Sequence, residues 1–247
     1  MQNRYTGDIG DFSKLGILRF LQAAGLSIGL NWYLVPDENH NGDGRHVQYL
    51  QNDFYRALDE VLWLELKGII KSGQRVVSSL EKEQILKATY FSEVLDIAGK
   101  PKLERTAIRD AWHRKAVNAL SGCDLICVDP DNGIIVPSAK GTAKENKFVT
   151  PDELRAYYSQ GSSIIYYQHK ARRSDSFYLS QHRQIVDKIS DGKASGLGLK
   201  FIKTSLRYYF FIIQPTHQEI VSRTIQRMMV SGWNSCFEKL EFEGEPS

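Results

Sequence analysis

Apolar and polar positions change along the chain in blocks that predict helices and strands in turn. Between Asp11 and Ala24 the apolar residues fall at helical spacing, and Gly25 is placed to end that helix. Residues 30–35 form an aromatic and branched run that predicts a strand, which Pro36 ends before a polar loop. Helices and strands that alternate in this way predict a layered, Rossmann-like α/β domain with a mainly parallel sheet and helices on both faces.

The clearest predicted strand is Asp-Leu-Ile-Cys-Val at residues 124–128. It is a short apolar run between turn residues, which is typical of a strand buried on both faces of a parallel sheet. It leads into the polar turn Asp-Pro-Asp-Asn-Gly at 129–133. Further on, Thr-Pro-Asp-Glu at 150–153 has the pattern of a capping box and predicts a helix that ends before Gly161.

The same reasoning assigns the rest of the chain. Further helices are expected at 46–73, 81–98, 112–120, 177–189 and from Pro215 to about 229, and further strands at 75–80, 103–108, 163–168, 199–204 and 207–213. The last two strands are expected to form a terminal antiparallel pair. The resulting hypothesis is a single α/β domain over 1–241, with a helical insertion at about 46–73 and a flexible tail at 242–247.

Unusual polar residues gather after three of the predicted strands. They occupy 37–45, 129–133 and 168–173. Because ligands in open α/β sheets bind outside the carboxyl ends of the strands, these three segments are expected to converge on one crevice.

Composition narrows the class of protein. The 247 residues are 42% hydrophobic and 25% charged, and no apolar run approaches the roughly 20 residues of a membrane span. The first twelve residues lack the apolar core of a secretory signal, and Cys123, Cys127 and Cys236 have no metal-ligand spacing. A cytoplasmic protein without a membrane association, disulfides or a structural metal is expected. The net charge of +3 neither indicates nor excludes a nucleic-acid partner.

Four motifs follow one another in an informative order. Gly-Asp-Ile-Gly-Asp-Phe-Ser-Lys at 7–14 opens the first helix, Gly-Asp-Gly-Arg at 42–45 follows the first strand, Glu81 follows the next strand, and Asp129-Pro130 ends the buried strand. Together they resemble the class I S-adenosylmethionine-dependent methyltransferases, most closely the family that methylates N6 of an adenine in large-subunit ribosomal RNA. That family has a Gly-Asn-x-Ala-Asp-x-x-Lys segment, a Gly-x-Gly-Arg turn, an acidic strand end and an Asp-Pro-Pro-Tyr motif in this order.

The resemblance implies S-adenosylmethionine as the cofactor and a nucleic acid, RNA or DNA, as the partner. Glycines allow close backbone approach to such a cofactor, and acidic residues accept hydrogen bonds from its hydroxyl and amino groups. The residues expected to bind it are Asp8, Asp11, Lys14, Asp37, Gly42, Asp43, Gly44, Glu81 and Asp110.

The implied reaction is methyl transfer to the exocyclic amine of a base, adenine N6 in that family, after the base has left its stack. Asp129 and the Pro130 carbonyl are expected to accept hydrogen bonds from the amine and orient its lone pair. Asp131 and Asn132 complete the catalytic turn, but they stand where the family has a proline and an aromatic residue that stacks on the base. The residues expected to contact the substrate are Lys140, Lys144, Lys147, His169, Lys170, Arg172 and Arg173.

Two other functions are compatible with the same residues. A magnesium-dependent nuclease would use Asp129 and Asp131 as oxygen ligands with Lys170 assisting, although Gln168 stands where such enzymes carry an acid. A catalytically inactive domain of the same fold would bind a nucleotide or a protein. Structural roles also stay open, because Asp, Asn and Gly are ordinary turn residues and a lysine-rich segment is often a solvated loop. The sequence leaves the substrate, pathway and oligomeric state open.

Overall fold

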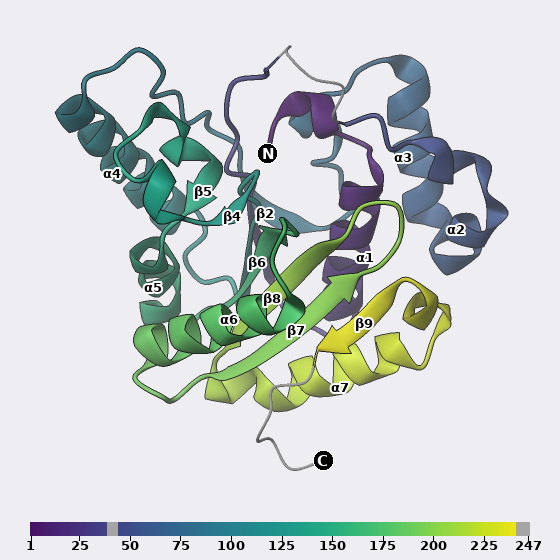
Figure 1. Cartoon of the computed structure of the whole chain (residues 1–247). Helices are drawn as coiled ribbons and strands as arrows, with labels where there is room; N and C mark the ends of the chain where they lie inside the picture. Colours follow the sequence, from purple (N-terminus) through teal and green to yellow (C-terminus); the bar gives the residue numbers. More distant parts are fainter. Residues whose placement is uncertain (39–43, 241–247) are drawn as a thin grey trace.

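A seven-stranded sheet crosses the centre of the molecule in the computed structural model, which describes residues 1–38 and 44–240 (Figure 1). Its strand order is β2-β1-β3-β6-β8-β7-β9. These strands are β1 (Ile28–Asn31), β2 (Ala88–Phe91), β3 (Leu125–Val128), β6 (Ser163–His169), β7 (Ser195–Phe201), β8 (Arg207–Ile213) and β9 (Phe237–Leu240). A small parallel pair, β4 (Gly133–Ile134) and β5 (Phe148–Val149), lies beside it.

The strand directions give the sheet a methyltransferase-like topology. β2, β1, β3 and β6 are parallel to one another, whereas β8 lies antiparallel between β6 and β7. β9 then adds an antiparallel edge against β7. The expected fold class is therefore confirmed: a parallel core is followed by an antiparallel carboxyl-terminal hairpin.

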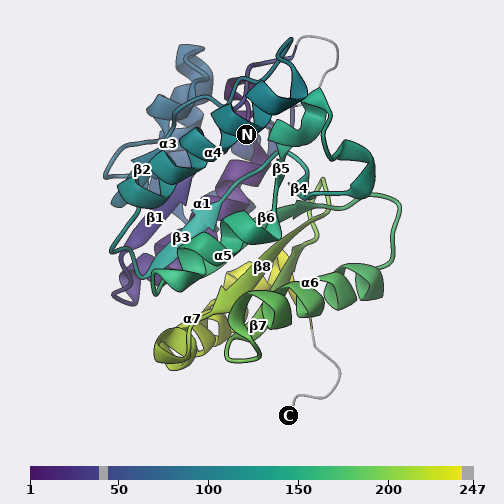
Figure 2. The same ribbon diagram turned by 90° about the vertical axis from the view of Figure 1, so that its left-hand side faces the viewer.

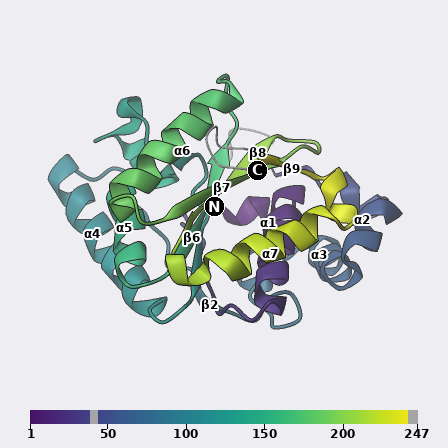
Figure 3. The same cartoon turned by 90° about the horizontal axis from the view of Figure 1, so that it is seen from below.

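Helices cover both faces of the sheet (Figures 2 and 3). One face carries α1 (Ile9–Ala23), α3 (Glu60–Ser72) and α7 (Gln218–Met229), and the other carries α4 (Lys102–Ala119), α5 (Pro151–Ser159) and α6 (Asp175–Ser190). The short α2 (Asp53–Leu58) precedes α3. None of the described helices combines the length and apolar character that a bilayer crossing requires.

Alternate side chains of β3 explain why this strand was recognisable. Leu125 and Cys127 pack in the core beneath α1, whereas Ile126 and Val128 pack in the core beneath α5. Side chains alternate across a strand, so a strand buried on both faces must be apolar at every position. The predicted strand and its position were both correct.

The start of α5 also matches its prediction. Thr150 Oγ1 accepts a hydrogen bond from Glu153 N at 3.2 Å, and Glu153 Oε2 accepts one from Thr150 N at 2.8 Å. Both bonds satisfy backbone donors that the first turn of a helix otherwise leaves open. The capping box is therefore formed as the sequence indicated.

Loss of this cap should have a modest, local effect. Thr150→Ala removes one of the two capping bonds, and we expect the free energy of unfolding to fall by about 1 kcal/mol. Ser159→Ala is the control, because Ser159 is exposed on the same helix. Urea unfolding of the two variants measures the difference, and equal stabilities would contradict the capping role.

Three predicted elements between 75 and 108 were wrong. The expected strand at 75–80 is a turn that contains the 3-10 helix Val77–Ser79, and the expected helix at 81–98 contains β2. β2 is a half-buried edge strand, so its mixture of buried and exposed positions was mistaken for part of an amphipathic helix. The expected strand at 103–108 belongs to α4. Leu103 is 87% exposed in that helix, so this apolar residue does not mark the buried face of the helix.

Other boundaries moved by a few residues. The first strand was expected at 30–35, but β1 ends at Asn31; residues 32–35 are buried without continuing the ladder. The expected insertion at 46–73 holds the 3-10 helix Gln48–Gln51, α2 and α3. That all of 1–241 forms one domain stays a prediction, and the tail expected at 242–247 lies outside the described residues.

Candidate functional site

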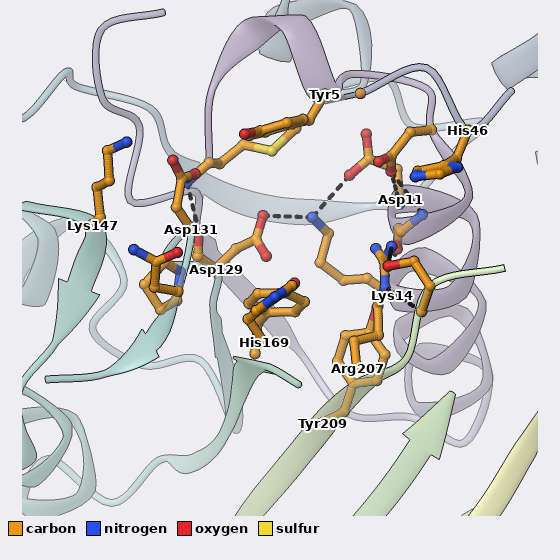
Figure 4. A pocket seen from close by; sticks show the side chains of 18 of the residues that line it. Tyr5, Asp11, Lys14, His46, Asp129, Asp131, Lys147, His169, Arg207 and Tyr209 are labelled. Carbon is orange, nitrogen blue, oxygen red and sulfur yellow. Dashed lines mark hydrogen bonds and ion pairs between the residues drawn. The ribbon is translucent and has the colours of Figure 1, made fainter. Parts of the chain in front are cut away.

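A polar cavity of about 330 Å³ opens at the carboxyl ends of β3 and β6, beside the first turn of α1 and the start of β8 (Figure 4). Its volume is at the low end of the range for small-molecule sites. Ten of the residues selected from the sequence line it: Asp8, Asp11, Lys14, Gly44, Asp129, Pro130, Asp131, Asn132, Lys147 and His169. The expected convergence of strand ends on one crevice is therefore observed for the described segments.

A buried ion-pair cluster lies in the middle of this cavity. Lys14 Nζ lies 2.9 Å from Asp11 Oδ1 and 2.6 Å from Asp129 Oδ2 (Figure 4). It also lies over the ring of Trp32, 4.7 Å from its centroid. The three charged side chains are at most 8% exposed. Charges buried this deeply require partners, so the cluster holds α1 and β3 in a fixed relation.

Burial and neighbouring charges perturb the ionisation of this cluster. Burial, together with the nearby carboxylates of Asp8 and Asp129, raises the pKa of Asp11 to about 6 despite its bond to Lys14. Burial alone would lower the pKa of Lys14, but Asp11 and Asp129 outweigh it and raise that pKa above its usual value. Lys14 thus stays protonated, and ionisation of Asp11 near pH 6 makes the cluster more negative.

The Asp11 shift predicts a pH-dependent stability. Folded Asp11 binds its proton up to about pH 6, against an ordinary pKa of 3.8. Between these values the native state holds more protons than the unfolded state, so the contribution of Asp11 to stability falls as the pH rises through 6. Asp11→Asn lacks this titration, so the variant should gain stability relative to wild type between about pH 4 and about pH 7 in urea unfolding. A pH-independent difference would contradict the shift.

The first turn of α1 is built from the predicted acidic residues. Asp8 is the N-cap, and its Oδ1 accepts hydrogen bonds from Gly10 N at 2.7 Å and from Asp11 N at 3.2 Å. Asp11 Oδ2 accepts a bond from Gly7 N at 2.8 Å. These acidic residues therefore hold the first turn of the helix, and the same side chains line the cavity.

The turn after β3 is held by contacts from distant segments. The Met1 amino group lies 2.8 Å from Asp131 Oδ1, and Gln2 Nε2 donates to Asp131 Oδ2 at 2.6 Å. Burial would raise the pKa of Asp131, but these contacts lower it below its ordinary value. The carbonyl oxygen of Asn132 accepts a bond from Gln168 Nε2 at 3.1 Å. These two positions thus give the cavity polar walls.

Aromatic rings reach the cavity from other elements. Tyr5 and Tyr167 both line it, and burial raises the pKa of Tyr167 to about 12. Aromatic residues thus reach the cavity from the chain before α1 and from β6, although Asp131 and Asn132 are not aromatic.

Several predicted cofactor residues do not line this cavity. Asp110 lies within α4 and lines a separate cavity of about 290 Å³ between α4 and the start of α5, because the strand expected before it is part of that helix. Glu81 accepts a bond from Trp32 Nε1 at 3.0 Å and does not follow a strand. The first acid after β2 is Glu93, which pairs with Lys115 at 2.7 Å. Asp37 is exposed and accepts a bond from Arg4 N at 3.3 Å.

The predicted substrate residues divide in the same way. Lys147 and His169 line the cavity, whereas Lys170 pairs with Asp175 at 3.0 Å outside it. The other four predicted substrate residues are exposed and do not line the cavity: Lys140, Lys144, Arg172 and Arg173. Gly42 and Asp43 lie outside the described residues, so their predicted cofactor contacts stay predictions.

The sequence reasoning missed nine residues that line the cavity, Arg207 and Tyr209 of β8 among them. β8 runs antiparallel to β6, so it begins where β6 ends, and Arg207 is paired with His169. The sequence did offer a signal for Arg207. In the predicted antiparallel pair, a strand that runs against β6 begins at the edge of the sheet where β6 ends, so its first charged residue lies beside the site. The others are Met1, Tyr5, Gly10, Glu38, His46, Tyr167 and Ser205.

Comparisons with known proteins add little beyond the fold. No protein-family model matches the chain, and no curated protein sequence is significantly similar to it. A solved structure from Legionella pneumophila strain Philadelphia 1, of domain-of-unknown-function family 519, is similar over 95% of this chain and 96% of its own. The identity is 13% and the TM-score is 0.42. The fold class therefore rests on the strand order and directions described above.

Proposed function

We propose that this protein transfers a methyl group from S-adenosylmethionine to the exocyclic amine of a nucleic-acid base, with adenine N6 as the expected target. One observation carries the proposal. Asp129 and Pro130 follow β3 of a methyltransferase-like sheet, and they line the same cavity as the acidic first turn of α1. This is the edge of the sheet where such folds bind ligands.

The residues present fit the polar parts of the cofactor. Its cationic amino group suits the carboxylate of Asp8, and its carboxylate suits Lys147 or Arg207. At Gly44, with φ +82°, a Cβ atom would come within 2.5 Å of the Arg4 carbonyl oxygen, so a side chain there would displace the segment that carries Tyr5 to the cavity. When bound, the cofactor would supply an electrophilic methyl group.

Asp129 has one carboxylate oxygen available for a substrate amine. Its Oδ2 is held by Lys14, whereas no described residue donates a hydrogen bond to its Oδ1. An amine that donates to Oδ1 and to the Pro130 carbonyl would have both hydrogens fixed, which aims its lone pair at the methyl group. Asp129 Oδ1 is also placed to take the proton that the amine releases. In this arrangement Lys14 positions Asp129.

The nucleic-acid partner is part of the same proposal. Lys147 is at the cavity edge and forms an ion pair with Glu38, and Lys144 lies in the same 3-10 helix, Ala143–Lys147. Lysines near the cavity would contact phosphates and contribute affinity without reading sequence. Tyr5 and Tyr167 supply rings against which an unstacked base packs.

The nuclease alternative finds less support in the same contacts. Asp129 is ion-paired with Lys14, and Asp131 is ion-paired with the Met1 amino group, so each prospective magnesium ligand already faces a cation. In the described parts of the chain, no group of three or more His, Cys, Asp and Glu side chains is arranged to hold a metal ion.

Cofactor binding tests the proposal without knowledge of the substrate. Titration calorimetry with S-adenosylmethionine should give saturable binding, and ligand at about 100 times Kd should stabilise the protein by about 2.7 kcal/mol. Gly44→Ala should lose this binding. Gly68→Ala is the control, because a Cβ atom there meets open space on α3. Wild-type protein that neither binds the cofactor at millimolar concentration nor melts at a higher temperature with it would overturn the proposal.

A further inference from the structure

Arg207 places a buried guanidinium at the wall of the cavity. It is the first residue of β8, lies opposite His169 of β6, and is only 7% exposed (Figure 4). Its Nη2 donates to Ser205 Oγ at 2.9 Å, and its Nε donates to the Ser205 carbonyl oxygen at 3.3 Å. These bonds fix the plane of the guanidinium while the residue lines the cavity.

No carboxylate neutralises this guanidinium within the described part of the chain. Asp8 and Asp11 are close enough to favour its charged form, but neither forms an ion pair with it, and no described residue accepts a hydrogen bond from its Nη1. A charge that is more than nine-tenths buried is normally paired. Arg207 therefore has unused donor capacity at the cavity wall.

The packing around Nη1 depends on a glycine. A Cβ atom at Gly10 would lie 1.7 Å from Arg207 Nη1, so the guanidinium rests on the first turn of α1 only because Gly10 has no side chain. The amides of that turn are already used: Gly10 N and Asp11 N bond to Asp8, and Ile9 N bonds to the His46 carbonyl oxygen. An incoming anion would consequently be held by the arginine side chain, in the positive potential at the start of the helix.

We propose that Arg207 forms an oxyanion subsite, in which Nη1 donates to a phosphate or carboxylate oxygen of the ligand that occupies the cavity. A fixed guanidinium that offers a charge-assisted hydrogen bond is suited to this group. The source of the oxyanion rests on the proposed function: it is a phosphate of the nucleic-acid substrate or the carboxylate of the cofactor. Recognition of the oxyanion itself does not depend on methyl transfer.

Two matched ligand pairs separate these sources. Adenosine 5′-monophosphate and adenosine differ in a phosphate, whereas S-adenosylhomocysteine and 5′-methylthioadenosine differ in the amino-acid end that carries the carboxylate. In calorimetric titrations the wild type should bind the member of one pair that carries the oxyanion, phosphate or carboxylate, about tenfold or more tightly. Arg207→Gln should reduce that ratio to near one. Arg223→Gln, on the exposed surface of α7, should leave the ratio unchanged.

Gly10→Ala gives a second test that keeps the arginine. Alanine favours the helix but displaces the guanidinium, so this variant should remain folded by circular dichroism and lose the same preference. The subsite proposal is overturned if the wild type prefers neither oxyanion-bearing ligand over its matched partner. It is also overturned if the preference survives in both Arg207→Gln and Gly10→Ala.

The outcomes for the subsite and for methyl transfer are distinguishable. An Arg207-dependent preference for the monophosphate, without any binding of S-adenosylhomocysteine, would support the subsite and count against the proposed function. If S-adenosylhomocysteine binds but Arg207→Gln leaves the affinity ratio of both ligand pairs unchanged, the result would support the proposed function and count against the subsite.

Discussion

Replacement of Lys14 by methionine is expected to lower the free energy of unfolding by about 3–5 kcal/mol, because it leaves two buried carboxylates without their cation. Asp11 and Asp129 both lie within 3 Å of Lys14 Nζ, and their side chains are almost fully buried. Methionine preserves most of the apolar stem, so the lost charge dominates the effect. Urea unfolding at neutral pH measures it.

The matched control for Lys14→Met is Lys71→Met, which removes a lysine from the exposed side of α3. That substitution should change stability by less than about 0.5 kcal/mol. A second variant isolates the cause: adding Asp11→Asn to Lys14→Met removes one unpaired charge and should recover part of the lost stability. A Lys14→Met protein as stable as the Lys71→Met protein would contradict the buried ion-pair account.

Asp129→Ala is expected to reduce the rate of methyl transfer by about 10²–10⁴-fold or more, because the amine loses both its orienting acceptor and its proton acceptor. Lys14 keeps Asp11 as a partner in this variant, so the protein should remain folded. Incorporation of labelled methyl groups into nucleic acid, followed under saturating cofactor, measures the loss.

Two comparisons make the Asp129 result specific. Asp187→Ala, on the exposed side of α6, should retain wild-type transfer. Asp129→Asn keeps one acceptor oxygen but cannot take the proton, so its rate should fall between those of Asp129→Ala and wild type. An active Asp129→Ala enzyme would mean that another group orients the amine.

Elements whose signals are local were the ones that the sequence predicted well. β3 is apolar at every position because both of its faces are covered, and α5 begins with a capping box whose bonds involve only Thr150 and Glu153. Both signals can be read from a few adjacent residues, although α1 and α5 cover the strand and Arg109 also bonds to Glu153. The sequence-based fold class followed from the order of such elements, and the sheet topology agrees with it.

Elements whose character depends on tertiary context were predicted poorly. β2 is a half-exposed edge strand of only four residues paired with β1, so the strand preference of Thr89, Tyr90 and Phe91 was too short a signal to interrupt the longer helix that the sequence predicted. The error moved the expected strand end to Glu81 and, with the misassigned start of α4, placed Asp110 at a strand end that does not exist. Both residues consequently lie away from the cavity.

The site was predictable to the extent that parallel strands share an edge. Asp129 and His169 follow from that rule, and Asp8, Asp11 and Lys14 were found through the resemblance of their motif. The Lys14 contact with Asp129 joins positions 115 residues apart, and no local pattern specifies it. Arg207 was missed because we treated the start of β8 as part of a core strand.

Chemical identification of the product tests the central proposal most directly. The protein is incubated with S-adenosylmethionine that carries a deuterated methyl group and with adenine-containing RNA or DNA, and the digested nucleosides are analysed by mass spectrometry. We expect label on an exocyclic amine, as N6-methyladenine, and none with Asp129→Ala. Label on carbon or on a ring nitrogen, or no labelled nucleoside from a wild-type protein that binds the cofactor, would contradict amine methylation at this site.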